Sequence, residues 1–356
     1  MSEPRSADYE HAMTAQPRLL SVLSNQASDR PPVWFMRQAG RFLPEYRELR
    51  AKAPDFIAFC LNPQMAAEAT LQPMRRFPLD AAIVFADILL LPQALGQTVW
   101  FAAGEGPRLG DLPSNAVLAD HLERSTEALS AVGETLGRVR SALEPERALI
   151  GFAGGPWTVA TYMIEGGSSD RTRSRSIAYA EPERIDGLLD ILAEATARYL
   201  AMQARAGAQA LKLFESWAEG LPEPLFDRLV IRPHALIIRR LREMGVTAPV
   251  IGFPRGAGAL VEGYAHKVEA QGVALDVQAS ADLGLRIQQT KAIQGALDPL
   301  LLRAGGPELD RRVEALLAQW SGGPYIFNLG HGILPDTPIE HVARTVDRVL
   351  RWSGQS

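Results

Sequence analysis

The feature that most constrains the fold of this chain is a regular alternation of short, β-branched apolar runs with longer segments of helical periodicity. Each run is bounded by proline, glycine or charged residues, as a buried strand would be. Between the third and fourth runs, apolar residues recur at three-, four- and seven-residue spacing from Ile185 to Leu200, which predicts one apolar helix face. The eight runs are 33–36, 81–85, 148–152, 210–214, 250–253, 274–277, 292–295 and 325–329. Further helical segments are expected near 63–76, 118–143, 223–244, 257–270, 281–289, 308–320 and 339–352.

Strands that alternate with helices form a parallel sheet, and eight such units favour a closed barrel over an open, doubly wound sheet. We therefore expect an α/β protein with a single (β/α)8 TIM-type barrel. A Rossmann sheet is the structural alternative, but no G-x-G-x-x-G motif follows the first run and no G-x-x-x-x-G-K-[ST] motif occurs in the chain. No internal linker is evident, so the expected organisation is a disordered N-terminal tail over 1–15 and a single barrel catalytic domain over 16–356.

Composition narrows the classes of function. The chain has 37 basic and 41 acidic side chains and a formal net charge of -4, which argues against a surface devoted to binding nucleic acid. Cys60 is the single cysteine, so neither a disulfide nor a cysteine-based metal cluster can form within one chain, which fits a reducing, cytoplasmic compartment. The polar N-terminal stretch has no apolar signal core, and the longest apolar run, near 81–91, is interrupted by Asp87 and stopped by Pro92. We expect neither export nor a membrane span.

Chemistry in a parallel barrel takes place where the strands end, so the residues directly after each apolar run are the candidates for a site. The first run leads into Arg37 and Arg41, two guanidinium groups four positions apart with Gly40 between them. If this turn is helical, both arginines share a face, and each planar fork can make two charge-assisted hydrogen bonds to a carboxylate or phosphate. The alternative is a pair of surface ion pairs to Glu45 or Glu48.

Asp87 follows the second run directly, so a carboxylate stands at the end of a buried strand among apolar residues. A buried charge is costly unless something requires it, which favours a functional role. A helix N-cap or a partner for an internal arginine would also explain it. After the third run, Gly154, Gly155 and Pro156 predict a tight turn into a helix whose free amides could receive an anion and whose Tyr162 could point its hydroxyl at the site.

Two more strand ends carry polar side chains. Ser216 follows the fourth run but lacks the flanks of a G-x-S-x-G nucleophile elbow, which argues against a covalent serine mechanism and leaves a hydrogen-bonding or a capping role. His331 stands between glycines directly after the last run, which favours ligand contact over burial in the core. The three arginines of 166–175 belong to either a lid or a solvated loop. The other residues at strand ends include Trp217, Pro254, Arg255 and Asn328.

These strand ends lie in segments that resemble the uroporphyrinogen decarboxylase family. The N-terminal signature covers 35–47, with the sequence FMRQAGRFLPEYR. The resemblance extends roughly from Gln16 to Trp352 and keeps the order of the family's motifs. The further matching segments are 85–89, 155–158, 162–166, 214–218, 252–256 and 328–332. The departures from the commoner pattern are Asp276-Val277, the run 295–299, and Glu219, which stands where a glycine often follows Ala218.

The resemblance implies a cofactor-free and metal-free barrel enzyme, usually a homodimer. Such an enzyme removes carbon dioxide from the acetate side chains of uroporphyrinogen III and gives coproporphyrinogen III in haem synthesis. It implies that Arg37 and Arg41 hold substrate carboxylates, and that Asp87 lies beneath the macrocycle and accepts hydrogen bonds from the pyrrole N–H groups. The other implied positions are the binding loop Gln38, Ala39 and Gly40 and the peripheral contacts Tyr162, Ser216 and His331.

Two other functions fit the same observations less well. A methyltransferase of the same barrel superfamily would use zinc or a corrinoid and needs a cysteine at the barrel mouth, whereas Cys60 precedes the first long helix, away from the predicted strand ends. A non-catalytic tetrapyrrole carrier would keep the pocket without the chemistry, which the presence of Asp87 with both arginines argues against. We therefore expect a decarboxylase in which Asp87 is the fixed negative charge that stabilises a transiently cationic pyrrole ring.

Overall fold

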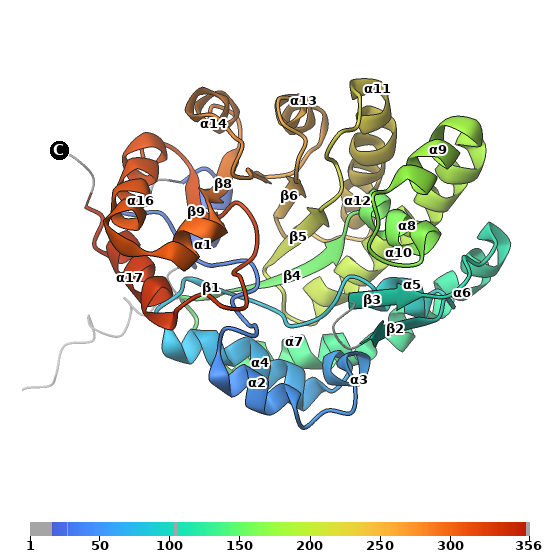
Figure 1. The fold of residues 1–356 in the computed structure, drawn as a ribbon, viewed down its shortest axis with the longest axis horizontal. Helices are drawn as coiled ribbons and strands as arrows, with labels where there is room; N and C mark the ends of the chain where they lie inside the picture. The colour runs from blue at the N-terminus through green and yellow to red at the C-terminus, as the bar shows by residue number, and fades with distance from the viewer. Residues whose placement is uncertain (1–15, 27, 103–105, 354–356) are drawn as a thin grey trace, which may run out of the picture.

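The computed structural model describes residues 16–26, 28–102 and 106–353, and the tail predicted over 1–15 lies outside the described residues. Its parallel strands form one curved sheet with the helices on the outer side, as the amphipathic segments require (Figure 1). This is the α/β, TIM-type barrel architecture that the alternation of strand and helix predicts. The strands in sheet order are β1 (Ala81–Ile83), β4 (Ala148–Gly154), β5 (Ala210–Glu215), β6 (Val250–Pro254), β7 (Gly272–Ala274), β8 (Ala292–Leu297) and β9 (Tyr325–Leu329).

The strand predicted at 33–36 is not a regular strand, although its residues close the barrel. The backbone N–H of Phe327 in β9 donates to Pro32 O at 2.9 Å, and the N–H of Asp80, just before β1, donates to Val33 O at 2.9 Å. Ladder pairing stops there because Pro32 has no N–H and because the N–H of Val33 donates to the Asp80 carboxylate at 2.7 Å instead of to a neighbouring strand. A single parallel bridge, Val33 to Phe327, therefore occupies the eighth position.

A further strand prediction differs from the structure, and one pair of strands was not predicted. β7 ends at Ala274, earlier than the predicted run at 274–277, because the Asp276 carboxylate accepts hydrogen bonds from Gly256 N at 2.7 Å and Gln278 N at 2.9 Å and holds this segment in a turn. An antiparallel hairpin of β2 (Val99–Ala102) and β3 (Gly106–Leu109) lies outside the barrel sheet and was not predicted.

The predicted helices are present, and two of the predicted segments differ from the structure in more than the position of their ends. The helix expected over 118–143 is two helices, α6 (Asn115–Ala128) and α7 (Ser130–Ala142). The segment at 223–244 contains a π-helical turn over 227–231, which ends two residues before Pro233, and the missing N–H of that proline cannot extend the regular ladder. The remaining helices are α1 (Arg18–Leu23), α2 (Pro44–Arg50), α3 (Phe56–Cys60), α4 (Pro63–Arg76), α5 (Leu90–Ala94), α8 (Pro156–Glu165), α9 (Thr172–Ala180), α10 (Pro182–Arg205), α11 (Glu223–Phe226), α12 (Arg232–Glu243), α13 (Leu260–Lys267), α14 (Ala281–Gln288), α15 (Pro299–Ala304), α16 (Gly306–Trp320) and α17 (Ile339–Leu350).

The hydrophobic core has two parts, one between the sheet and the helices and one inside the barrel. The barrel interior is filled by aliphatic and aromatic side chains, and α1 contributes Leu19 and Leu23 to it beside the alanines that begin several strands. Lys212 of β5 is fully buried in this interior, with its Nζ 5.6 Å from the ring centre of Trp34 and 5.3 Å from that of Phe214. In the part of the chain that the structure describes, no helix has the length and apolar character needed to cross a membrane.

Candidate active site

Side chains from several segments meet at the mouth formed by the carboxyl ends of the strands. Asp87 follows β1, Tyr162 lies on α8 after β4, and Arg255 follows β6. The charge of Arg37 interacts with all three of these groups. His331, after β9, lies close enough to Arg37 and Arg255 for both charges to act on its imidazole. Residues far apart in the chain are thus brought together at the end of the barrel where such folds carry chemistry.

The loop that carries the two N-terminal arginines is a turn rather than a helix, so they share no helix face. Arg37 has a left-handed backbone with φ of 61°, which is uncommon for a residue other than glycine and marks a position held by its surroundings. Arg41 lies within electrostatic range of Arg37, and Ala39 between them packs against the core. Glu45, considered above as a surface partner, instead pairs with Arg76 at 2.8 Å. Arg37 thus lies beside Asp87 at the mouth, and Arg41 is exposed next to it.

The side chain of Gln38 is buried beneath this loop. Its Oε1 accepts a hydrogen bond from Phe35 N at 3.0 Å, and its Nε2 donates to Ala81 O, at the start of β1, at 3.1 Å. These bonds fix the loop to the barrel and thereby set where the arginine side chains begin. A β-carbon on Gly40 would lie 2.9 Å from the carbonyl oxygen of Arg37, so the tightness of the turn requires a glycine.

Asp87 is half-buried between β1 and α5. Its Oδ1 accepts a hydrogen bond from the N–H of Leu89 at 2.8 Å, so the capping role considered above is real but uses one oxygen. Burial raises the pKa of Asp87 to about 6, and the Leu89 N–H and the nearby Arg37 charge only partly oppose this. The carboxylate is therefore mostly ionised at pH 7 while carrying a desolvation penalty, as expected of a group held ready for a cationic partner.

His331 is half-buried between Gly330 and Gly332. Burial lowers its pKa to about 4, and the positive charges of Arg37 and Arg255 add to the effect. The imidazole is thus neutral near pH 7 and offers one donor and one acceptor nitrogen. Without ligand, His331 can therefore hydrogen-bond a neighbouring group but adds no positive charge to the mouth.

Tyr162 lies at the edge of the mouth, where the loops after β4 and β5 meet. Its ring packs against the Trp217 indole with 5.9 Å between ring centres. Its hydroxyl lies beside the hydroxyl of Ser168 and is close to Asp87 and Arg37. Burial raises the pKa of Tyr162, so the phenol stays protonated and can donate a hydrogen bond.

Arg255 is a site residue to which the sequence assigned no role, although it stands two residues after the run at 250–253. Its backbone N–H donates to Glu215 O at 2.9 Å, and its guanidinium reaches the carbonyl oxygen of Ser216 at 3.5 Å. Ser216 is half-buried at this end of β5, consistent with the strand-end position expected for it. The mouth therefore carries Arg255 in addition to Arg37 and Arg41.

Comparison with known proteins decides the family. The family model for uroporphyrinogen decarboxylase (URO-D) matches residues 14–352. A uroporphyrinogen decarboxylase of Phenylobacterium zucineum is 68% identical over 94% of this chain and 98% of its own length. The chain belongs to the uroporphyrinogen decarboxylase family. A Caulobacter vibrioides family member is 68% identical over 94% of this chain and 95% of its own length, and one from Maricaulis maris is 52% identical over 95% and 98%.

The fold of this family extends to proteins of low sequence identity. A methyltransferase from Methanosarcina mazei superposes with a TM-score of 0.72 over 93% of this chain and 97% of its own, at 20% sequence identity. That likeness shows a common barrel and nothing about the reaction. Cys60, the candidate thiolate ligand of the methyltransferase alternative, is fully buried in α3, and burial raises the pKa of its thiol, so it stays protonated.

A buried polar network supports the mouth in this family member and was not predicted. Glu215, the last residue of β5, accepts a hydrogen bond from Thr158 N at 2.7 Å and another from the Thr158 hydroxyl. Its other oxygen lies 3.3 Å from Nε2 of His234, whose Nδ1 lies 2.7 Å from the Tyr264 hydroxyl. The anion expected at the start of α8 is therefore the protein's own carboxylate and not a ligand. A β-carbon on Gly155 would lie 2.2 Å from Glu215 Oε2, which explains a glycine there.

Proposed function

We propose that the chain removes carbon dioxide from the acetate side chains of uroporphyrinogen III and gives coproporphyrinogen III without an added cofactor. It is a carboxy-lyase of porphyrin and haem biosynthesis, as a member of its family. The observation that carries the residue assignment is one ionisable carboxylate, Asp87, half-buried at a mouth that also holds Arg37, Arg41 and Arg255. That arrangement suits a substrate with a cationic intermediate and many carboxylates.

The reaction needs a temporary electron acceptor, and the pyrrole ring can serve as one. Protonation of the ring makes it cationic, the bond between the acetate methylene and its carboxylate then breaks, and the electron pair flows into the ring as carbon dioxide leaves. A proton then adds to the exocyclic methylene to give a methyl group, and the ring carbon loses the proton that it first accepted, which restores the neutral pyrrole. In our proposal Asp87 accepts hydrogen bonds from the pyrrole N–H groups, and its fixed charge stabilises the ring cation in a site of low dielectric.

The remaining residues bind and orient the substrate in this proposal. Arg37 and Arg41 each hold a carboxylate through charge-assisted, bidentate hydrogen bonds. Ala39 and Gly40 bring the backbone close to the ligand, and the buried Gln38 acts by holding this loop. The contacts assigned to the substrate's periphery are those of Tyr162, Ser216 and His331.

The wider assignments follow from the family resemblance and the composition. We propose a homodimer working in the cytoplasm, built from a single barrel domain over 16–356. Size-exclusion chromatography with light scattering would measure whether the protein is a dimer, and limited proteolysis would test whether it is a single domain.

Anaerobic incubation of the purified protein with uroporphyrinogen III, followed by chromatography of the oxidised products, tests the function directly. We expect intermediates with progressively fewer carboxylates and then coproporphyrin. Recovery of unchanged uroporphyrin in a complex with the protein would favour a carrier. Activity that depends on added zinc and a methyl donor, with no carbon dioxide released, would favour the methyltransferase alternative.

A further inference from the structure

The loops after β4, β5 and β6 meet at one rim of the mouth, and Arg171 lies there. Its guanidinium carbon is 4.5 Å from the ring centre of Trp217, so the guanidinium stacks on the indole. Trp217 in turn packs against Tyr162, with 5.9 Å between their ring centres. Arg171 is thus separated from a proposed substrate contact by a single aromatic ring.

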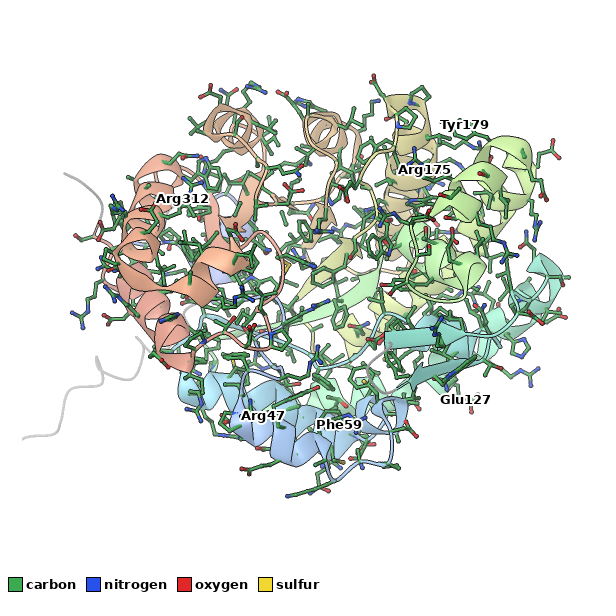
Figure 2. All side chains as sticks on the ribbon, viewed as in Figure 1. Arg47, Phe59, Glu127, Arg175, Tyr179 and Arg312 are labelled. Carbon is green, nitrogen blue, oxygen red and sulfur yellow. The ribbon has the colours of Figure 1, made fainter. Side chains whose placement is uncertain are left out.

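Arg171 is held more weakly than its neighbour in the same segment. Its acidic partner is Glu219, whose Oε2 lies 4.0 Å away and whose side chain is 57% exposed. Ion pairs this long and this exposed contribute little to stability. Arg175, by contrast, donates a hydrogen bond of 2.8 Å to the carbonyl oxygen of Gly220 and so ties α9 to the loop after β5. Arg175 is labelled in Figure 2. Arg175 anchors the segment, and Arg171 is free to exchange its partner.

The backbone around Arg171 and Glu219 is closely packed, so we expect an exchange of partners to involve the side chains alone. Arg171 has a left-handed backbone with φ of 66°, an unfavourable conformation that the loop nonetheless maintains. The Cβ of Glu219 would lie 2.6 Å from a β-carbon on Gly256, so the loops after β5 and β6 are in close contact there. Gly256 follows Arg255, so the backbone of Glu219 packs beside the loop that carries Arg255, while its carboxylate pairs with Arg171.

We propose that Arg171 binds a peripheral carboxylate of the porphyrinogen and that the Glu219 carboxylate holds its guanidinium until the substrate displaces it. This inference rests on the proposed function, since every pyrrole ring of uroporphyrinogen carries an acetate and a propionate. A macrocycle seated on Asp87 presents carboxylates all around its edge, including the edge beside Trp217. A guanidinium stacked by its face keeps its N–H edge available for a bidentate bond.

Steady-state kinetics with anaerobic uroporphyrinogen III tests this with four variants. Arg171→Ala should raise KM about tenfold and change kcat little, because a charge-assisted hydrogen bond to bound substrate is lost. Arg171→Lys should lie in between, since a lysine keeps the charge but loses the fork and the stack. Glu219→Gln should lower KM severalfold by removing the competing anion. Arg173→Ala, which changes an exposed arginine in the first turn of α9 two residues further on, is the matched control and should match the wild type.

The outcomes separate this inference from the proposed function. A wild-type enzyme that turns over uroporphyrinogen, together with an Arg171→Ala variant of unchanged KM, would overturn the inference and leave the function intact. If Glu219→Gln instead raises KM as much as Arg171→Ala does, the ion pair has a structural role. That result would also overturn the inference. A wild-type protein that releases no carbon dioxide would overturn the function itself.

Inhibition by coproporphyrinogen III, which carries propionates and no acetates, identifies the kind of carboxylate bound. If Arg171 binds a propionate, Arg171→Ala should raise the inhibition constant by the same factor of about ten as KM. If it binds an acetate, the inhibition constant should stay at the wild-type value. In both cases the rise in KM caused by Arg171→Ala should shrink at high salt, because screening weakens the contact in the wild type.

Discussion

The side chain of Arg37 lies across the backbone of Gly332, so that a β-carbon built on the glycine would come within 2.4 Å of the arginine's Cδ. The two residues come from opposite ends of the chain and meet where the barrel closes. The glycine after His331 therefore provides the space through which Arg37 reaches the mouth. Any larger residue at position 332 must displace that side chain.

Gly332→Ala should therefore lower kcat/KM by about tenfold or more while leaving the protein folded, because it moves a guanidinium that must be placed within a fraction of an ångström. Kinetics and thermal unfolding of the same preparation measure both effects. Gly322→Ala, with open space around the added methyl at the other end of β9, is the control and should behave as the wild type. Equal activity in the two variants would show that the position of Arg37 is not critical.

Asp87→Asn should lose about a hundredfold or more in kcat, because it removes the charge that stabilises the ring cation. It should also be more stable than the wild type at pH 7. Burial raises the pKa of Asp87 from 3.8 to about 6, so the folded state binds a proton more tightly than the unfolded state does. Ionisation of Asp87 therefore lowers the free energy of unfolding of the wild type by about 1–3 kcal/mol above pH 6, and this destabilisation disappears below pH 4.

Urea unfolding of the wild type and Asp87→Asn at pH 4, 5, 6 and 7 measures this difference. The gap in unfolding free energy should open between pH 4 and pH 6 and then stay constant. A variant that is less stable than the wild type at pH 7 would contradict the desolvation argument, whatever its activity.

The acid limb of kcat/KM should report the same carboxylate. Because the pKa of Asp87 is about 6, activity should fall about tenfold per pH unit well below that value as the carboxylate is protonated. His331 should add no step between pH 5 and pH 8, since its pKa is about 4. His331→Gln should accordingly show the same fall in kcat/KM at acid pH as the wild type. A flat profile from pH 7 to pH 5 would argue against an essential Asp87 anion.

Lys212→Met should stabilise the protein. The Lys212 amine is fully buried, and its Nζ has no hydrogen-bond partner among the described residues. Burial holds the pKa of Lys212 in the folded protein well below 10.5, so between these two pKa values the amine carries a proton only in the unfolded chain. The free energy of unfolding should therefore rise with pH, from the lowered pKa of the folded protein up to pH 10.5. We expect a gain of about 1–3 kcal/mol at pH 7 from replacing a buried polar group by an apolar side chain of similar length.

Denaturant unfolding of the wild type and Lys212→Met at pH 7 and pH 10 measures the sign of the stability difference and its dependence on pH. The difference between the two proteins should narrow at the higher pH, by up to about 1.4 kcal/mol per unit across the titration range. A gap that widens with pH would show that the amine is charged in the folded protein.

Gly155→Ala should destabilise the fold and impair the site together. The added methyl would lie 2.2 Å from Glu215 Oε2 and 2.8 Å from His234 Nε2, so the buried carboxylate must shift from its three hydrogen bonds. We expect a loss of about 2–4 kcal/mol, as for disruption of a buried polar network. Gly137→Ala, with nothing within 4 Å of the added carbon, should instead stabilise α7 by up to about 1 kcal/mol.

The sequence predicts this fold well because each element carries its own periodicity. The helical spacing from Ile185 to Leu200 lies within α10, and the segment at 63–76 is α4, whose cap residue Asn62 accepts a hydrogen bond from Met65 N at 3.0 Å. The predictions that were wrong involve tertiary partners. The 33–36 run has strand-like residues, but the carboxylate of Asp80 takes the N–H that a ladder would need.

The sequence by itself determined the barrel, the strand ends at which chemistry could occur, and the candidates Arg37, Arg41, Asp87 and His331. It did so because hydrophobic periodicity and strand polarity are local properties that need no knowledge of partners. The tertiary structure alone decided which charged groups lie beside one another. It brought Arg255 to the mouth, gave the start of α8 to the buried carboxylate of Glu215, and set the pKa of Asp87 near 6. Burial and electrostatic interaction depend on distances between segments far apart in the chain, and these exist only once the barrel has closed.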